Sequence, residues 1–401
     1  MVSISAQSLS DRLADLDPVG ITASGVHRLA WTAEDAACRA WFERQASSVG
    51  LRVERDPAGN LWACPQADPP WWGIGSHLDS VRGGGRFDGP LGVACGFEIA
   101  AAASGLPVAV ISFADEEGAR FNTPTFGSKA LTGKLDVAAV LERRDEHGIT
   151  IAEAMREAGV NPETIAAAPG GLPRLQGFCE IHIDQCQDVA KAGVPIAIVS
   201  ALAGRMRLEV ELRGQADHAG TTPPHDRHDA LAAAARVIVA AQEHGRAASG
   251  PRVTTARMLI EPNAATTIAS HVRLWVDFRD REMERLERLR GELEAEATAI
   301  ARRERVEATI ELASRSEGQE FDSGLRSRLL AAARDSLGQP VPEHVCFAGH
   351  DAGVLAERIP AAMVLVRNPT GVSHSPAEHV SLEDAASACA VVATALEEPE
   401  E

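Results

Sequence analysis

The sequence predicts an α/β protein with a mostly parallel central sheet, interrupted by a smaller α+β domain. Strand-like apolar runs alternate with helical patterns from Trp71 to about Ser200. The pattern then changes, because residues 205–213 alternate strictly between apolar and polar side chains. The α/β alternation resumes at Asp322 and ends with the apolar run 362–366. A chain of 401 residues is long enough for two domains.

The first part of the chain contains the elements expected of a helix-covered sheet. Residues 1–70 show two helical patterns and then a hairpin, whose turn at residues 57–60 lies between apolar runs. The alanine-rich stretch 91–103 predicts a crossover helix. Residues 107–113 are almost continuously apolar, which is typical of a strand buried on both faces. These elements predict parallel strands in the centre of the sheet.

The middle of the chain has a different order of elements. After the strand at 205–213, the sequence predicts a helix over 226–244, strands over 252–260 and 271–279, a long helix over 281–303 and a strand over 306–313. This β-α-β-β-α-β order is the ferredoxin-like split motif. We therefore assign residues 206–316 to an inserted domain, and residues 1–205 and 317–401 to the domain that carries the large sheet.

The composition excludes several classes of partner. A formal net charge of −18 argues against nucleic acid, because a phosphate-binding face needs concentrated Lys and Arg. No segment approaches the ~18 consecutive apolar residues of a membrane span, and the first residues lack a signal-peptide pattern. We expect a cytoplasmic protein without a membrane partner.

The seven cysteines do not predict a metal ribbon or a disulfide framework. They are scattered, odd in number and without C-x-x-C spacing, so most are expected to be small core residues. Cys186 is the exception, because it follows the candidate metal ligand His182 by four residues.

Candidate metal ligands follow strand-like runs in several short segments. Because parallel strands end at the same edge of a sheet, the His, Asp and Glu residues after them are expected to gather there. Nitrogen and oxygen ligands at one edge suit a two-metal hydrolase. The segments are GIGSHLDS (73–80), GGGRFDG (83–89), VISFADEEG (110–118), FCEIHID (178–184) and VLVRNPTGVSHSP (364–376).

The first of these ligands are His77, Asp79 and Asp88. In an extended chain, H-x-D places His77 and Asp79 on one side, so that the histidine can bind a metal while the aspartate supports its other nitrogen. Alone this pattern is weak, and a buried core histidine is the alternative. Asp88 lies in a glycine-rich loop before a helix, where a carboxylate can bridge two cations ~3.5–4 Å apart.

The acidic triplet Asp115-Glu116-Glu117 follows the most apolar strand of the chain. Adjacent acids against an apolar wall repel one another unless cations neutralise them. One glutamate can bind metal while the other serves as general base, and the residues alone leave open which does which. A solvated acidic loop is the alternative. His182 and His374 complete a set that suits Zn²⁺, Mn²⁺, Co²⁺ or Ni²⁺ and not Ca²⁺.

As an ordered set, these motifs resemble the M20 metallohydrolases. The resemblance is to the amidase and carbamoylase branch, which contains N-carbamoyl-L-amino-acid hydrolases, β-ureidopropionases and allantoate or ureidoglycolate amidohydrolases. It extends from about residue 26 to residue 378. The motifs that carry it are GSHLDSVRGGGRFDGPLGV, FADEEGARF, GSKALTG, EIHIDQ, ADHAGTTP with Arg227 and Asp229, DFR, GHDAG and GVSHSPAEH.

The resemblance implies a ligand scheme and a fold. It makes Glu116 the base and acid of the reaction and Asp79 the partner of His77. It implies a phosphorylase/hydrolase-like catalytic domain with a mixed sheet, plus a lid domain that forms a homodimer. The metal ligands that it implies are His77, Asp88 and His182 for one divalent ion and Asp88, Glu117 and His374 for the second.

The resemblance also implies the residues that contact substrate. His218 would polarise the scissile carbonyl in the active site of the partner subunit, with a surface histidine as the alternative. Arg279 would bind the substrate carboxylate, with a strand-end salt bridge as the alternative. Gln185 would contact the amide or ureido group, and His350 with Asp351 would shape the pocket.

Three positions depart from the pattern of the branch. Thr266 stands where the branch has an Asn that helps to bind the carboxylate, so only one hydrogen bond would remain there. Cys186 replaces a glycine beside Gln185, and Pro224 replaces the common Met. The metal ligands are intact while the substrate contacts differ, which suggests an altered substrate.

These observations predict a two-metal amidohydrolase that cleaves the linear C–N bond of an N-carbamoyl amino acid or related small carboxylate. The alternatives are an allantoate or ureidoglycolate amidohydrolase of purine breakdown, and an aminoacylase or dipeptidase. A binding or regulatory relative without activity is a further alternative, but that class would lack Glu116 or a ligand, and all are present.

Overall fold

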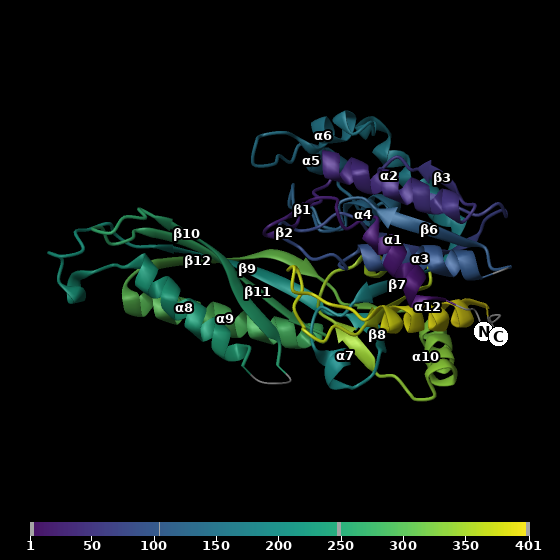
Figure 1. Cartoon of the computed structure of the whole chain (residues 1–401). Helices are drawn as coiled ribbons and strands as arrows, with labels where there is room; N and C mark the ends of the chain where they lie inside the picture. The colour runs from purple at the N-terminus through teal and green to yellow at the C-terminus, as the bar shows by residue number, and fades with distance from the viewer. Residues whose placement is uncertain (1–3, 104, 247–249, 398–401) are drawn as a thin grey trace. The chain divides into compact units, whose positions relative to one another are not determined.

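The computed structural model describes residues 4–103, 105–246 and 250–397 of the chain (Figure 1). The chain divides into two compact units. The first unit contains residues 1–200, 320–344 and 348–401, and the second contains residues 201–319 and 345–347. The predicted insert, residues 206–316, lies within the second unit.

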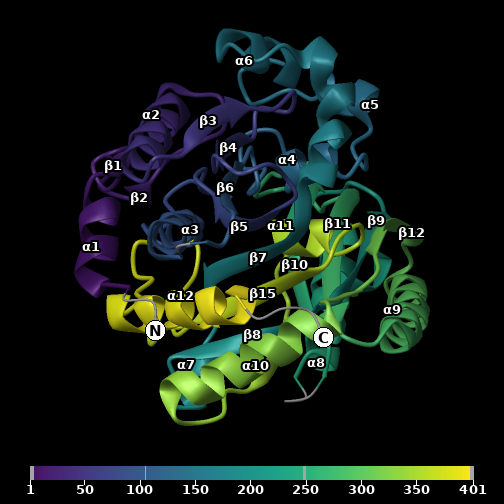
Figure 2. The same cartoon turned by 90° about the vertical axis from the view of Figure 1, so that its right-hand side faces the viewer.

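The first unit is built around a mixed sheet with parallel strands at its centre, as the sequence predicts (Figure 2). β15, β7, β5 and β6 pair in parallel, whereas β8, β4 and β3 add antiparallel edges. In spatial order the strands are β13 (Gln319–Glu320), β8 (Ile196–Leu202), β15 (Ala361–Val366), β7 (Leu175–Ile183), β5 (Trp71–His77), β6 (Val108–Phe113), β4 (Leu61–Cys64) and β3 (Arg52–Arg55), with β14 (Glu343–Cys346) paired to β8.

Helix α3 (Pro90–Ala102) lies directly against the central strands and appears end-on in Figure 2. Its glycines allow this close approach, because a Cβ on Gly92 would lie 2.3 Å from the Ile181 carbonyl oxygen. The same apolar core includes residues of helices α1 (Ala6–Ala14), α2 (Ala33–Ser48), α10 (Ser323–Leu337) and α12 (Leu382–Glu397).

A separate apolar cluster includes Trp31, Phe121, Phe126 and Ile151. It contains residues of the short helices α4 (Phe126–Leu131), α5 (Val137–Leu141) and α6 (Ile151–Glu157) and of the 3-10 segment η1 (Pro162–Arg174). The remaining short elements of this unit are β1 (Ile21–Thr22), β2 (Gly25–Val26), α7 (Asp188–Lys191) and α11 (Asp351–Leu355).

The second unit has the predicted β-α-β-β-α-β order. Its sheet has the strand order β10-β11-β9-β12, which is the ferredoxin-like arrangement. Helices α8 and α9 lie side by side along this sheet (Figure 1), and buried residues of β9 such as Leu208 and Val210 pack with them. The elements are β9 (Gly204–Arg213), α8 (Ala230–His244), β10 (Arg252–Glu261), β11 (His271–Asp280), α9 (Met283–Glu304) and β12 (Glu307–Ser316).

One predicted helix begins later than expected. The structure starts α8 at Ala230 and not at residue 226, because the Asp229 carboxylate accepts hydrogen bonds from the backbone N–H groups of Leu231 and Ala232. A short 3-10 turn, Pro224–Asp226, precedes this cap. Among the described residues, no helix is both long enough and apolar enough to cross a bilayer.

Candidate active site

The carboxyl ends of the central parallel strands bring the candidate ligands together. His77 is the last residue of β5, and His182 is the penultimate residue of β7. Glu116 and Glu117 follow β6, and His374 lies in the loop after β15. Asp88 occupies the loop between β5 and α3, just before Pro90 begins the helix.

Asp88 lies at the centre of this cluster, with its two oxygens facing different histidines. Its Oδ1 is 3.6 Å from His77 Nε2 and 3.2 Å from His182 Nε2. Its Oδ2 is 3.7 Å from His374 Nε2, and the same nitrogen is 3.5 Å from Glu117 Oε1. A carboxylate in this position can contribute one oxygen to each of two neighbouring cations.

The backbone orients two of the histidines. Nδ1 of His77 is 3.0 Å from the Asp79 carbonyl oxygen, and Nδ1 of His182 is 2.9 Å from the Ile183 carbonyl oxygen. Because a carbonyl oxygen only accepts, each Nδ1 carries a proton, which leaves Nε2, the nitrogen that faces Asp88, as the one that can bind a metal ion. His182 Nε2 is buried and has no hydrogen-bond partner among the described residues.

The Asp79 carboxylate acts mainly on the glutamates. It accepts hydrogen bonds from the backbone N–H groups of Glu116 (3.1 Å) and Glu117 (3.0 Å). Its Oδ1 lies 3.7 Å from His77 Nδ1, farther than the Asp79 carbonyl oxygen. Asp79 therefore joins the end of β5 to the turn after β6, where Asp115 adopts a positive φ of 51°.

Burial makes this cluster electrostatically costly. Burial, together with the nearby Asp88 carboxylate, raises the pKa of Glu117 to about 8. Burial also raises the pKa of Glu116 well above its usual range, although His77 opposes the shift. A buried set of carboxylates that resists ionisation is stabilised by bound cations.

The geometry permits more than one set of three ligands. The donor atoms of each set lie within 4.8 Å of one another, and the nitrogen and oxygen donors fit divalent transition metals. Asp88 belongs to both sets of the predicted ligand scheme. The sets are His77, Asp88 and His182; Asp88, Glu117 and His374; His77, Glu116 and Glu117; and Glu180, His182 and His350.

Glu378 is a residue of this site for which the sequence predicted no role. Its Oε1 accepts hydrogen bonds from the backbone N–H groups of Phe87 (2.7 Å) and Asp88 (3.0 Å), and it is only 5% exposed. A Cβ at Gly85 would lie 2.0 Å from the Glu378 Cδ, so the loop needs glycine there. Glu378 lies in the GVSHSPAEH motif, and that position is the sequence feature that could have indicated its role.

The predicted substrate residues of the first unit lie beside these ligands. Gln185 Nε2 donates to Asp88 Oδ2 at 3.2 Å. The buried His350 ring contacts the His182 ring edge-on, with centroids 4.4 Å apart. Both His350 nitrogens lack a hydrogen-bond partner among the described residues. The half-buried Cys186 instead bonds Asp184 Oδ1 through its thiol at 3.1 Å.

The second unit places His218 and Thr266 together. His218 Nδ1 accepts hydrogen bonds from the N–H groups of Gly220 (3.0 Å) and Thr221 (3.1 Å), so its Nε2 carries the proton. The ring is exposed, and the Thr266 carbonyl oxygen accepts from Ala219 N–H at 2.9 Å. An exposed N–H donor of fixed tautomer suits stabilisation of a developing oxyanion.

Arg279 lies elsewhere in the second unit, near the end of β11. Its Nε donates to Asp277 Oδ1 at 2.8 Å, and its Nη1 donates to the Phe347 carbonyl oxygen at 2.6 Å. These contacts hold the guanidinium on the sheet. The sequence left a strand-end salt bridge as the alternative role of Arg279, and the structure contains such a salt bridge to Asp277. It is made by Nε and does not use Nη2.

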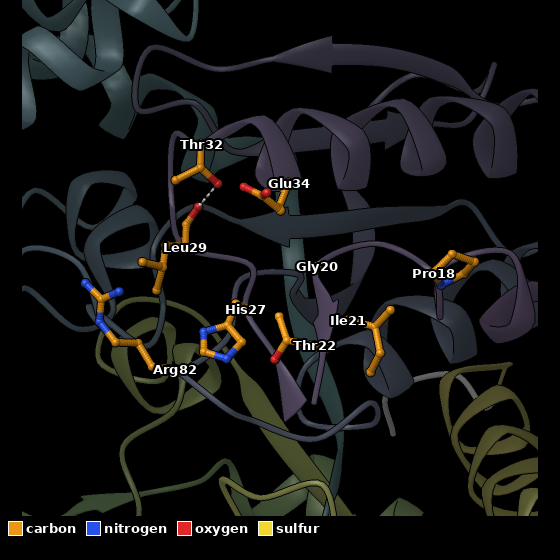
Figure 3. Close-up of a pocket in the computed structure, with 9 residues that line it drawn as sticks. All are labelled: Pro18, Gly20, Ile21, Thr22, His27, Leu29, Thr32, Glu34 and Arg82. Atoms are coloured by element: carbon orange, nitrogen blue, oxygen red, sulfur yellow. Dashed lines mark hydrogen bonds between the residues drawn. The ribbon is translucent and has the colours of Figure 1, made fainter. Parts of the chain in front are cut away.

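A separate cavity of about 350 Å³ lies beside the β1–β2 hairpin (Figure 3). Its lining includes Ile21, Thr22, His27 and Arg82 and, among the described residues, no candidate metal ligand. Arg82 is directed to Glu146 in an exposed ion pair. This cavity therefore offers no chemistry comparable to that around Asp88.

Comparisons with known proteins give consistent results. The sequence profile described as Peptidase family M20/M25/M40 matches residues 73–398. The chain is 36% identical to the N-carbamoyl-L-amino acid amidohydrolase of Geobacillus stearothermophilus, over 98% of this chain and 97% of that protein. It is 31% identical to the allantoate amidohydrolase of Bacillus subtilis, over 93% of each chain.

A solved structure supports the same relationship. The hydantoinase/carbamoylase family amidase from Burkholderia multivorans superposes with a TM-score of 0.86 at 30% identity, covering 98% of each chain. The profile match, residues 73–398, spans the positions of every candidate ligand described above. The chain belongs to the M20/M25/M40 peptidase family.

Proposed function

We propose that this protein is a metal-dependent amidohydrolase that cleaves the carbamoyl or ureido C–N bond of an N-carbamoyl amino acid or related small carboxylate. The observation that carries the proposal is the position of Asp88, whose two oxygens face separate histidines. Relatives named as N-carbamoyl-L-amino-acid amidohydrolases, 36% and 33% identical over nearly the whole chain, support this class of substrate.

Two divalent transition-metal ions per subunit, Zn²⁺ or Mn²⁺ with Co²⁺ or Ni²⁺ as alternatives, fit the donor set. One would be held by His77, Asp88 and His182, and the other by Asp88, Glu117 and His374. The orphaned Nε2 of His182 supports this assignment. When bound, such ions polarise a carbonyl and lower the pKa of a water toward ~7.

Glu116 is the proposed general base and acid. It would take the proton of the attacking water and return it to the leaving nitrogen. Its backbone is fixed by the Asp79 carboxylate, and its Oε2 lies 3.7 Å from His77 Nε2, at the edge of the ligand cluster. A carbamoyl substrate would yield CO₂, ammonia and the free amino acid.

The remaining site residues are proposed to bind substrate. His218, in the active site of the partner subunit, would donate its Nε2–H to the scissile carbonyl oxygen. Arg279 and Thr266 would bind the substrate carboxylate. Gln185 and His350 would contact the amide or ureido group, supported by their positions beside Asp88 and His182.

A homodimer formed through the second unit is part of this proposal. The outward side of α8 and α9 carries a groove of about 960 Å³ lined by small and apolar residues that include Ala235, Val239 and Ile300. Val239 is 55% exposed in this groove, and an exposed apolar patch rimmed by charged residues is typical of a protein–protein interface. A cytoplasmic location also remains a prediction, and the absence of disulfides among the seven cysteines is compatible with it.

Allantoate or ureidoglycolate is the second candidate substrate, favoured by the 31% identical allantoate amidohydrolase of Bacillus subtilis. The test is to supply the purified, metal-loaded enzyme with N-carbamoyl amino acids, allantoate, ureidoglycolate and N-acetyl amino acids, and to measure ammonia. Ammonia released fastest from N-carbamoyl amino acids supports the first candidate. Hydrolysis of N-acetyl substrates alone, without ammonia, would contradict both.

A further inference from the structure

Three arginines form a row across the sheet of the second unit. By strand register, Arg279 on β11 lies directly opposite Arg252 on β10 and directly opposite Arg205 on β9. Their sequence neighbours Met206 and Phe278 belong to the core beneath the helices. Since side chains alternate along a strand, the three arginines share the opposite face.

Such a row is unfavourable unless anions compensate it, because like charges directly opposite on a sheet repel. The Asp277 carboxylate lies one step along the same face. It accepts from Arg279 Nε at 2.8 Å and from Arg207 Nη2 at 2.9 Å. Asp277 therefore serves two guanidinium groups and is already occupied.

Arg205 has no hydrogen bond or ion pair from its side chain to any residue that the structure describes. Its Nε is buried and unpartnered. Burial lowers the pKa of the Arg205 guanidinium, Asp277 opposes that shift, and the guanidiniums of Arg207 and Arg279 reinforce it. A partly buried guanidinium without a partner is costly, so an anion from outside the chain is the natural partner.

We propose that Arg205 binds a second acidic group of the substrate, beside Arg279, so that the preferred substrates are derivatives of dicarboxylic amino acids. This inference rests on the proposed function, in which Arg279 binds the carboxylate shared by all these substrates. A guanidinium suits this task, because its planar fork matches a carboxylate.

The charges favour two acidic groups over one. Arg205, Arg207 and Arg279 carry three positive charges, and Asp277 supplies one negative charge. A dicarboxylate would therefore compensate the charge of these three guanidiniums more fully than a monocarboxylate would. Arg252 extends the row and packs over the Phe347 ring, 3.8 Å from its centroid.

The test compares kcat/KM for N-carbamoyl-L-glutamate with that for N-carbamoyl-L-methionine, a neutral side chain of similar length, in wild type and Arg205→Met. We expect wild type to prefer the glutamate derivative, and Arg205→Met to lose roughly 10- to 100-fold on it, the effect of one charged hydrogen bond. The methionine derivative should change less than about threefold. Arg213→Gln, on the same strand and the same face, is the matched control.

The outcomes separate the possible roles of Arg205. An equal loss on both substrates would place Arg205 on the shared carboxylate and overturn the proposal, as would no loss on either. A wild-type enzyme that hydrolyses only the neutral substrate would overturn the proposal while the proposed function stands.

If wild type releases ammonia from neither substrate, the proposed function fails and calorimetry decides the anion site separately. Binding of succinate, but not butyrate, by wild type and its loss in Arg205→Met would support the site. Equal binding of succinate by both proteins would overturn it.

Discussion

The two units each carry a cluster of ionisable side chains, and the clusters differ in how they are held. Around Asp88, acids and histidines lie at strand ends, and neighbouring groups fix them: Asp79 binds the glutamate backbone, and Glu378 binds the Asp88 loop. On the second sheet, Arg205 is placed by strand register alone. An acidic cluster held in place by hydrogen bonds is suited to permanently bound cations. A guanidinium without a side-chain partner is suited to a substrate that binds and dissociates.

Metal removal is expected to have the largest effect on activity. Dialysis against a chelator should abolish ammonia release by more than about 10³-fold and lower the melting temperature, because the carboxylates around Asp88 then repel one another. The arginine row of the second unit contains no candidate metal ligand, so succinate binding by Arg205 should persist in the metal-free protein. Full activity after verified metal removal would contradict the account of the first cluster.

Glu116→Gln should have the next largest effect. Loss of the general base is expected to lower kcat by about 10²–10⁴-fold, while metal content stays near that of wild type. Steady-state kinetics and metal analysis on the same preparation check this. Loss of metal together with activity would instead make Glu116 a ligand, as in the set with His77 and Glu117.

Glu378→Ala should have an intermediate effect on metal affinity. Without the acceptor for the Phe87 and Asp88 amides, the loop loosens, and metal affinity should fall about 10- to 100-fold, measured by chelator competition. Glu378→Gln keeps an acceptor oxygen and should recover most of the affinity. Glu383→Gln, an exposed residue nearby in sequence, is the control. Equal loss of metal affinity in the Ala and Gln variants would show that the hydrogen bonds from the Phe87 and Asp88 N–H groups do not determine that affinity.

The smallest of the expected effects is the change in stability caused by Arg205→Met. Removing an unpartnered guanidinium should leave the free energy of unfolding unchanged or raise it by up to about 1 kcal/mol, measured by urea titration. Arg213→Gln breaks an exposed pair with Glu211 and should change it by less than about 0.5 kcal/mol. A loss above about 2 kcal/mol in Arg205→Met would show that Arg205 has a structural partner.

The same contrast explains what the sequence could predict. The family and the enzyme class are confirmed by the relatives, and the α/β sheet and the ferredoxin-like unit are confirmed by the structure. The ligand cluster around Asp88 is visible in the sequence because its members lie at the ends of the central strands or in the loops that follow them. Strand ends of a parallel sheet meet at one edge, so local patterns were sufficient there.

Contacts between distant segments were not visible in the sequence. Glu378 meets the Asp88 amide across 290 residues, and the row through Arg205 and Arg279 depends on which residues of β9 and β11 pair. Register and loop geometry are set by the whole fold, so the role of Glu378 and the position of Arg205 required the structure. The late start of α8 has a more local cause, the Asp229 cap.

The central claim is that Asp88 joins two metal sites in one catalytic centre. The most direct measurement is the metal content per subunit of wild type, Asp88→Ala and His374→Ala, determined beside ammonia release from N-carbamoyl amino acids. We expect two ions in wild type, about one in His374→Ala, and weak binding at both sites with no activity in Asp88→Ala. An Asp88→Ala protein that keeps two tightly bound ions and wild-type ammonia release would contradict it.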